Sequence, residues 1–340
     1  MRPFVYEQPA DISAAVAIAA RFASNDEQPT RASAQFIAGG TNLADYMKLG
    51  VAKPDHLLDL NRLEDTGLRQ IRVTDGGMRF GALVRMGEAA DHAEVKRRYP
   101  VVSDSLRLAA SGQIRNMASL AGNVLQRTRC EYFRETSWHC NKRVPGSGCA
   151  AMEGFNRQHA VLGSSDACIA TYHGDFGQAL IALDAVVHAE GSRGARKIPF
   201  AKLHRQPGDT PHVETDLAAD EIITAIDVPA LPWARRSLYL KIRDRESFAF
   251  ALASAAVALD LDGDSVRDAR IALGGVSTVP WRAKAAEDAL QGKTLDEATA
   301  QAAADAAFAD AEPRQHNAFK IELGKRTLVR ALLETREMKV

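Results

Sequence analysis

The sequence predicts an α+β protein built from three successive units, and three observations support this fold class. At 340 residues, with 46% hydrophobic residues, the chain is long enough for two or three separate cores. Apolar runs of strand length alternate with segments of helical periodicity through the first 230 residues. After Pro229 and Pro232 the order changes to a group of strands followed by Ala-rich helices, which indicates a separate C-terminal unit.

The first predicted unit comprises residues 1–61. Asp11 stands where it can cap a helix whose apolar face includes Ile12 and Phe22. A later strand is broken by the pair Gly39-Gly40 and followed by a second helical pattern, which gives a strand, glycine turn and helix. We expect helices at 12–22 and 43–49 and strands at 35–38, 56–60 and 78–83, the strands forming a small mixed sheet.

The second predicted unit comprises residues 62–229 and ends in a strand at 222–228. It is interrupted at about 126–171 by a stretch rich in Gly, Arg and Cys that shows no sustained period. A structureless insert of this length inside a compact domain is usually functional or holds a cofactor.

The third predicted unit, 230–340, is of the α+β class. Its expected strands lie at 238–242, 250–259 and 270–273, and its helices at 295–311 and 321–335. The run 248–259 (FAFALASAAVAL) is too short to cross a bilayer and is interpreted as buried core.

Charge and the N-terminal sequence exclude several classes of partner. Lys plus Arg equals Asp plus Glu at 43 each, so no overall field would draw the chain to nucleic acid or to an anionic membrane. The start, MRPFVYEQPADIS, has no apolar h-region, and we therefore expect no export signal on this chain. The expected location is the cytoplasm, or the periplasm if a signal-bearing partner carries the chain out.

Two glycine-containing motifs are candidates for ligand binding. The turn AGGTNL (38–43) follows a strand and could present backbone N–H groups to a phosphate, although a plain tight turn is the simpler interpretation. It does not match the G-x-G-x-x-G motif of dinucleotide-binding folds, and it lacks the lysine of a P-loop. The second motif, SGQIRN (111–116) leading to SLAGN (119–123), could line a flat ligand, or could be an ordinary polar loop.

All four cysteines of the chain lie in the insert, at Cys130, Cys140, Cys149 and Cys168. Their spacing fits neither a zinc ribbon nor a bacterial ferredoxin run, so zinc, an iron–sulfur cluster and disulfides all remain open on spacing alone. The basic excess of 127–157 would offset the charge of a thiolate-ligated cluster, or could be a solvated basic face. Three histidines, His139, His159 and His173, leave a mixed Cys/His zinc site conceivable.

The two glycine motifs, with KIRDR at 241–245, resemble the FAD-binding subunits of the xanthine oxidase family, in the same order and over essentially the whole chain. The resemblance implies two α+β subdomains of the vanillyl-alcohol-oxidase-like (PCMH) FAD-binding fold and a C-terminal domain of the CO dehydrogenase flavoprotein type. It implies a pyrophosphate site at 37–43 and a flavin site further on. The implied cofactor-binding residues are Ile37, Ala38, Gly39, Gly40, Thr41, Asn42, Leu43, Ala109, Ser119, Gly122, Asn123, Asp175, Ile223 and Lys241.

The insert itself is similar to that of the flavin subunits of bacterial periplasmic aldehyde oxidoreductases. The similar runs are RTRCEYF (127–133), CNKR (140–143), PGSGCAA (145–151), RQHA (157–160) and ACIAT (167–171). The resemblance implies a [4Fe–4S] cluster on Cys130, Cys140, Cys149 and Cys168. A related insert in the flavin subunit of 4-hydroxybenzoyl-CoA reductase means that the insert alone does not fix the substrate.

The expected function is that of an electron-transfer subunit of a molybdenum-dependent aldehyde oxidoreductase, in which FAD passes electrons to an external acceptor. The expected partners are a molybdopterin-binding large subunit and a small subunit with [2Fe–2S] clusters. No catalytic residue is nominated on this chain, because we find no His or Tyr constellation for acting on a substrate. One alternative is the flavin subunit of a hydroxybenzoyl-CoA-reductase-like or other xanthine-dehydrogenase-type enzyme. Two others are a stand-alone flavin oxidase and a zinc-stapled binding module, and the binding module leaves both glycine motifs unexplained.

Overall fold

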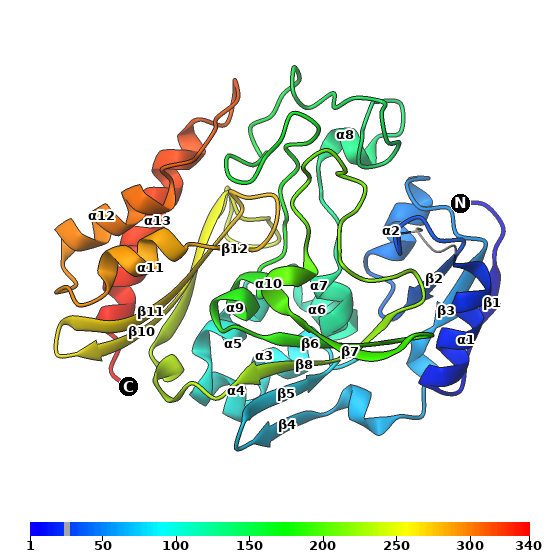
Figure 1. Cartoon of the computed structure of the whole chain (residues 1–340), viewed down its shortest axis with the longest axis horizontal. Helices are drawn as coiled ribbons and strands as arrows, with labels where there is room; N and C mark the ends of the chain where they lie inside the picture. The colour runs from blue at the N-terminus through cyan, green and yellow to red at the C-terminus, as the bar shows by residue number, and fades with distance from the viewer. Residues whose placement is uncertain (24–27) are drawn as a thin grey trace.

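The computed structural model of the chain describes residues 1–23 and 28–340, and it contains three β-sheets that follow one another along the sequence (Figure 1). The three-stranded sheet, the five-stranded sheet and the four-stranded sheet each use strands from one continuous part of the chain. The helices and the sheets together give the α+β fold that the sequence predicts. Within the described residues, no helix has both the length and the apolar character needed to span a membrane.

The first sheet has the strand order β1-β3-β2 and is parallel throughout. Its strands are β1 (Val5–Glu7), β2 (Ala34–Ile37) and β3 (His56–Asp59), and its helices are α1 (Ile12–Phe22) and α2 (Leu43–Lys48). The predicted cap is confirmed, because the Asp11 side chain accepts a 2.7 Å hydrogen bond from the backbone N–H of Ala14.

The prediction of a mixed first sheet was wrong. The strand expected at 78–83 is β5 (Gly77–Gly81), which belongs to the second sheet and pairs there with β4 (Ile71–Thr74) and β8 (Ile222–Pro229). A short apolar run shows that a strand exists but not which partner it takes, since pairing depends on residues far away in sequence.

The second sheet has the order β4-β5-β8-β6-β7 and is antiparallel. Its remaining strands are β6 (Val186–Gly191) and β7 (Gly194–Pro199). Helical segments of this region are η1 (Leu60–Arg62), η2 (Thr66–Arg69), α3 (Met86–Asp91), α4 (Ala93–Arg98), α5 (Pro100–Arg107), α6 (Gly112–Met117), α7 (Leu120–Val124), α9 (Phe176–Ala182) and α10 (Phe200–Leu203). Phe80 of β5 and Phe176 of α9 meet edge to face in the core, with their ring centroids 6.4 Å apart.

The cysteine-containing insert has little regular structure, in agreement with its lack of period. Its one helix in the described chain is α8 (Glu131–Arg134), and isolated bridges join Cys140 to Cys149 and Ser165 to Cys168. Figure 1 shows the insert as a set of loops on one side of the molecule, between α2 and the C-terminal helices.

The third sheet is antiparallel with the order β12-β11-β10-β9, and its core is closed by helices. Its strands are β9 (Ser237–Ile242), β10 (Ala253–Asp262), β11 (Ser265–Gly274) and β12 (Trp281–Arg282). Its helices are η3 (Pro232–Arg235), α11 (Lys284–Leu290), α12 (Glu297–Ala307) and α13 (Phe319–Arg336).

The interpretation of 248–259 as buried core was wrong for its first part. Phe248 and Phe250 are 55% and 42% exposed, and β10 begins only at Ala253. Residues 253–259 are buried because β10 lies between two strands and under α13, whereas the preceding residues form a loop.

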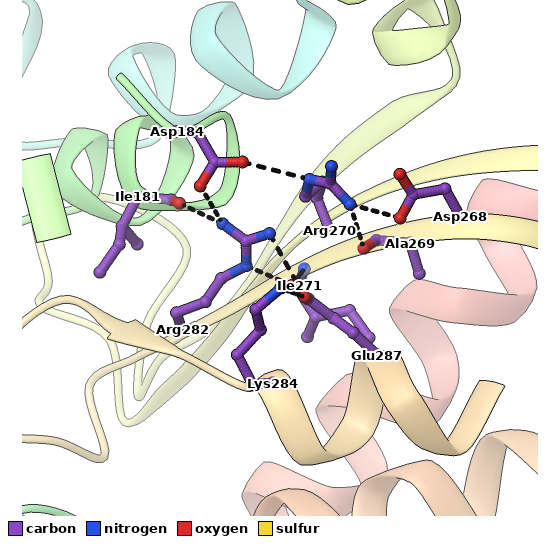
Figure 2. A network of polar contacts seen from close by, with 9 residues as sticks. All are labelled: Ile181, Asp184, Asp268, Ala269, Arg270, Ile271, Arg282, Lys284 and Glu287. Atoms are coloured by element: carbon purple, nitrogen blue, oxygen red, sulfur yellow. Dashed lines mark hydrogen bonds and ion pairs between the residues drawn. The ribbon is translucent and has the colours of Figure 1, made fainter. Parts of the chain in front are cut away.

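An arginine at the edge of the third sheet links that sheet to the C-terminal end of α9 (Figure 2). The Arg282 guanidinium donates to the backbone carbonyl of Ile181 and to Asp184, both at 2.8 Å, and it also pairs with Glu287 on α11. Glu287 is almost fully buried and accepts a further bond from the backbone N–H of Ile271 at 2.8 Å. The C-terminal end of α9 is thereby held against β11 and α11.

Candidate functional site

The glycine turn after β2 packs directly on the second glycine motif. A Cβ atom on Gly39 would lie 2.1 Å from the carbonyl oxygen of Met117, so only glycine allows the two segments to approach this closely. Gly40 has a φ of +69°, which glycine adopts without strain. The Asn42 amide donates to the carbonyl of Gly122 at 3.1 Å. The two motifs, about 80 residues apart in sequence, therefore form one structure.

The same turn is held from its other side by Asn61 and Arg85. The Asn61 amide donates to the carbonyl of Ala38 at 2.7 Å, and Arg85 donates to the Asn61 side-chain oxygen at 2.9 Å. The conformation of the loop is thus fixed by residues of the chain before any ligand binds, which lowers the entropic cost of binding.

A cavity of about 210 Å³ lies on one side of the turn, between α2, α7 and β8. Ten of the predicted cofactor-binding residues line it, namely Ile37, Ala38, Gly39, Gly40, Thr41, Asn42, Leu43, Ser119, Gly122 and Ile223. The rest of the wall is largely apolar, with Leu60, Leu83 and Leu217 among its residues. An apolar cavity with polar backbone along one edge suits a flat ring attached to a phosphate.

A larger cavity of about 980 Å³ lies on the other side of the turn. Its wall includes the predicted residues Ala109, Asn123 and Asp175. Thr41 and Asn42 line both cavities, so the two adjoin at the end of the glycine turn. A long ligand with a phosphate in its middle could place its phosphate at this turn and one ring in each cavity.

Lys241 is the one predicted residue that lines neither cavity. It is buried, and its ammonium donates to Asp175 at 2.9 Å and to the carbonyl of Leu108 at 3.0 Å. Tyr239 donates to the other oxygen of Asp175 at 2.7 Å. Burial raises the pKa of the Asp175 carboxyl, and Lys241 and Tyr239 oppose that shift. Two side chains of β9 thus orient a carboxylate in the wall of the large cavity.

Asn123, in the wall of the large cavity, carries a buried polar atom that has no hydrogen-bond partner among the described residues. Asn123 donates from its amide nitrogen to the Met86 sulfur at 3.3 Å, but its side-chain oxygen accepts no hydrogen bond within the described chain. A buried acceptor without a donor is costly, and a ligand carrying an N–H or O–H group would satisfy it. This orphaned oxygen and the preformed turn fit FAD, whose ring and ribityl chain carry such donors.

The structure adds wall residues that the sequence did not indicate. The large cavity also contains Met86, Ala110, Arg129, His173 and Phe248. Ala110 has a φ of +48° and Phe248 a φ of +51°, so two non-glycine residues in the left-handed region lie in this wall. Arg129 comes from the insert and donates to the Asn42 side-chain oxygen at 2.6 Å. The Arg-rich composition of the insert was the only available signal for this contact.

The four cysteines are reduced and gather in one place. Cys130, Cys140 and Cys168 are buried, and Cys149 is half-buried beside them in the same apolar cluster with Tyr46 and Phe133. Burial raises the pKa of Cys168 to about 11 and raises that of Cys130 further, and neighbouring cysteines contribute in the same direction. None of the four forms a disulfide.

Groups that can donate hydrogen bonds surround the sulfur atoms. The backbone N–H of Ala170 donates to the Cys168 sulfur at 3.4 Å, and His159 Nε2 lies 3.1 Å from the Cys130 sulfur. Among the residues that the structure describes, no set of three or more His, Cys, Asp or Glu side chains is arranged to hold a metal ion. The iron–sulfur cluster therefore stays a prediction at this point. His139 is exposed, and His173 belongs to the wall of the large cavity.

Five of the six basic residues at 127–157 have partners outside the insert, and the sixth, Arg143, donates to carbonyls within it. Arg129 and Arg134 pair with Asp45 of α2 at 3.2 and 2.6 Å, and Arg157 pairs with Asp244 at 3.0 Å. Arg127 and Lys142 share Glu214, with nitrogen–oxygen distances of 2.5 and 3.6 Å. These ion pairs attach the insert to segments outside it, a role that the sequence analysis did not consider for the basic excess.

Comparisons with known proteins agree with this geometry. Residues 2–231 match the family described as the FAD binding domain in molybdopterin dehydrogenase, and residues 238–335 match the CO dehydrogenase flavoprotein C-terminal domain. The chain is 49% identical to the FAD-binding subunit of an aldehyde oxidoreductase of Escherichia coli, over 89% of this chain and 92% of that protein. It is 27% identical to the carbon monoxide dehydrogenase medium chain of Hydrogenophaga pseudoflava, over 92% of this chain and 88% of that one.

Solved structures show the same fold. A chain of carbon monoxide dehydrogenase from Hydrogenophaga pseudoflava superposes with a TM-score of 0.74 at 27% identity, covering 98% of this chain and 96% of that chain. A chain of the enzyme from Oligotropha carboxidovorans, at 23% identity, gives a TM-score of 0.75 and covers 99% of both chains. With two family matches spanning most of the sequence and a relative at 49% identity, the chain belongs to the FAD-binding subunits of the xanthine oxidase family, the molybdenum hydroxylases, and is an oxidoreductase subunit.

Proposed function

We propose that this chain is the FAD- and [4Fe–4S]-carrying electron-transfer subunit of a molybdenum-dependent aldehyde oxidoreductase. The observation that carries the FAD part is the shared wall formed by Thr41 and Asn42, which places a preformed glycine turn between two cavities. The aldehyde part rests on the 49% identity to the E. coli subunit, which bears that activity in its name.

In this proposal the glycine turn holds the FAD pyrophosphate, with the adenine in the smaller cavity and the flavin ring in the larger one. Gly39 and Gly40 allow the phosphates to approach the backbone, and Asn42 keeps the turn attached to Gly122. The Asn123 oxygen accepts from the ligand, and Lys241 keeps Asp175 in place in the cavity wall. Bound FAD supplies the redox chemistry, and these residues bind and orient it.

The four cysteines are proposed to hold the [4Fe–4S] cluster. They are reduced, they share one buried cluster, and backbone N–H groups such as that of Ala170 point at sulfur. A zinc ion needs all its ligands about 2.0 to 2.3 Å from one point. The thiolates of a cubane cluster each bind a different iron atom, so a donor set too widely spaced for a single ion can still suit the cluster.

The proposed assembly contains a molybdopterin-binding large subunit and a [2Fe–2S] small subunit, with this chain passing electrons to an external acceptor. We propose units at 1–61, 62–229 and 230–340, supported by the three sheets and by the gap between the two family matches at 231 and 238. Location follows the assembly, since a folded complex can be exported through a twin-arginine signal on one partner and otherwise stays in the cytoplasm.

Activity of the assembled and isolated chain tests the proposal. Co-expression with the large and small subunits should yield aldehyde oxidation with an artificial acceptor, and the chain alone should have none. Full aldehyde turnover by the isolated, molybdenum-free chain would contradict the subunit assignment and favour a stand-alone flavin oxidase. If the assembly turns over hydroxybenzoyl-CoA instead of aldehydes, the chain is better assigned as the flavin subunit of a hydroxybenzoyl-CoA reductase.

A further inference from the structure

A histidine that the sequence singled out without a role lies within hydrogen-bond distance of a cysteine sulfur. His159 is 5% exposed, and its Nε2 lies 3.1 Å from the Cys130 sulfur, well within hydrogen-bond distance for sulfur. His139, which is adjacent in sequence to Cys140, is exposed and makes no comparable contact within the described residues. The histidine next to a cysteine in the sequence, His139, is therefore not the one that contacts a cysteine sulfur in the structure, which is His159.

The surroundings of His159 Nδ1, the other ring nitrogen, indicate whether Nε2 donates a hydrogen bond to the Cys130 sulfur or accepts one from it. Its Nδ1 is buried and has no hydrogen-bond partner among the described residues. A proton on Nδ1 would be a buried N–H without an acceptor, which proteins rarely tolerate. The Nδ1–H tautomer is therefore disfavoured. The remaining form carries its proton on Nε2, directed at the Cys130 sulfur.

The backbone around His159 is held by the C-terminal unit. Asn317 donates to the carbonyls of His159 and Ala160 at 3.3 and 3.1 Å. Lys320 on α13 donates to the His159 carbonyl at 3.1 Å, and both Asn317 and Lys320 are fully buried. The imidazole is therefore positioned by residues about 160 positions away, and not by the insert alone.

We propose that His159 is a positioning residue for the cysteine cluster and donates a hydrogen bond from Nε2–H to the Cys130 sulfur. Asn317 and Lys320 hold the backbone of His159 in place for this bond. The proposal rests on the proposed function, because the bond can affect a reduction potential only when Cys130 ligates iron. A hydrogen bond to a ligating sulfur stabilises the more negative, reduced state of a cluster and raises its reduction potential.

The first test uses the intact assembly and needs no variant. Pulsed EPR of the reduced cluster, in protein grown with ¹⁵N-labelled histidine, should detect one coupled histidine nitrogen and one exchangeable proton. The absence of both couplings from a fully reduced cluster would overturn the proposal.

Potentiometric titrations then compare His159→Leu, His159→Gln and the matched control His139→Leu. Loss of the donor in His159→Leu should shift the cluster to lower potential, while the amide of His159→Gln should restore part of the shift. His139→Leu should match the parent, and the FAD content and flavin potential should be unchanged in all three. A cluster potential in His159→Leu equal to that of the parent would overturn the proposal.

Failure of the proposed function is distinguishable from failure of this inference. A parent assembly without iron and labile sulfide beyond those of the [2Fe–2S] subunit would end the cluster assignment and this inference with it. A parent that holds the cluster but shows no histidine coupling would end only the inference. If His159→Leu does not fold, the label experiment on the parent still decides.

Discussion

Arg129 donates a 2.6 Å hydrogen bond to the side-chain oxygen of Asn42, and this bond joins the cysteine insert to the glycine turn. Asn42 in turn donates to the carbonyl of Gly122, so one side chain connects three segments of the proposed FAD site. Arg129 directly precedes Cys130, and it lines both the large cavity and a small cavity of about 40 Å³ beside Cys130. The proposed flavin and cluster sites are therefore neighbours, with a common structural support.

Replacing Gly40 by Asp should abolish FAD binding without unfolding the chain. A side chain at this position meets only the tip of Ile37 at 3.7 Å, so there is room for it, but its carboxylate would repel the pyrophosphate. The control is Gly263→Asp, because Gly263 has a similar φ of +58° in open space far from the cavities. FAD per chain, measured by absorbance, should fall to near zero in Gly40→Asp only. Equal flavin content in the two variants would show that the turn does not hold the phosphates.

Removing the charge of Lys241 should destabilise the flavin-free protein. In Lys241→Met the buried Asp175 carboxylate loses its ion-pair partner, and breaking a buried pair in this way costs about 3–5 kcal/mol. The double variant Lys241→Met/Asp175→Asn should recover part of that loss, because no uncompensated charge remains. Urea unfolding of the three proteins measures this. A single variant as stable as the parent would contradict the assignment of a buried ion pair.

The two ion pairs of Glu287, with Arg282 and with Lys284, should contribute unequally to the stability of the protein (Figure 2). Glu287→Ala removes a buried carboxylate, which leaves the Ile271 N–H without its acceptor and Arg282 with Ile181 and Asp184 as its partners. This change should cost about 3 kcal/mol or more. Lys284 pairs with the same carboxylate but is 67% exposed, so Lys284→Ala should cost less than about 1 kcal/mol. Thermal unfolding should rank the variants in that order, and equal losses would contradict it.

Glu214 should make part of the stability depend on pH in the acid range. Burial raises the pKa of Glu214, but Arg127 and Lys142 more than offset this and hold the pKa below its usual value. A carboxyl with a depressed pKa in the folded state contributes stability above its unfolded pKa of about 4.5, and this is lost as the pH falls through the folded pKa. Glu214→Gln should be less stable than the parent at pH 7, and the difference should shrink toward pH 3. The exposed Glu153→Gln serves as control, and a difference that does not change with pH would refute the prediction.

Local features of the fold and site were predictable because their causes lie within a few residues. The Asp11 cap, the strand before Gly39-Gly40 and the confinement of the cysteines to an unstructured insert all follow from short patterns. All the predicted cofactor-binding residues except Lys241 line the two cavities. Their roles came from resemblance, since composition and spacing alone left a plain turn or polar loop open.

The remaining features depend on contacts between distant segments, which periodicity does not encode. The partner of β5, the approach of Gly39 to Met117 and the bond from Arg129 to Asn42 each join residues separated by more than 75 positions. The loop containing Phe248 and Phe250 looked like core because apolar composition does not distinguish a buried strand from the wall of a ligand cavity.

The most direct test of the central claim is the cofactor content of the purified protein. Flavin, iron, acid-labile sulfide and zinc should be measured on the same sample, isolated without oxygen and after expression with its partner subunits. This chain should contribute one FAD to the assembly. It should also contribute about four iron and four sulfide, as a cubane cluster requires, in addition to the iron and sulfide of the [2Fe–2S] subunit. The Cys130→Ser variant should lose that extra iron and sulfide while keeping FAD. Stoichiometric zinc without the extra labile sulfide would contradict the account.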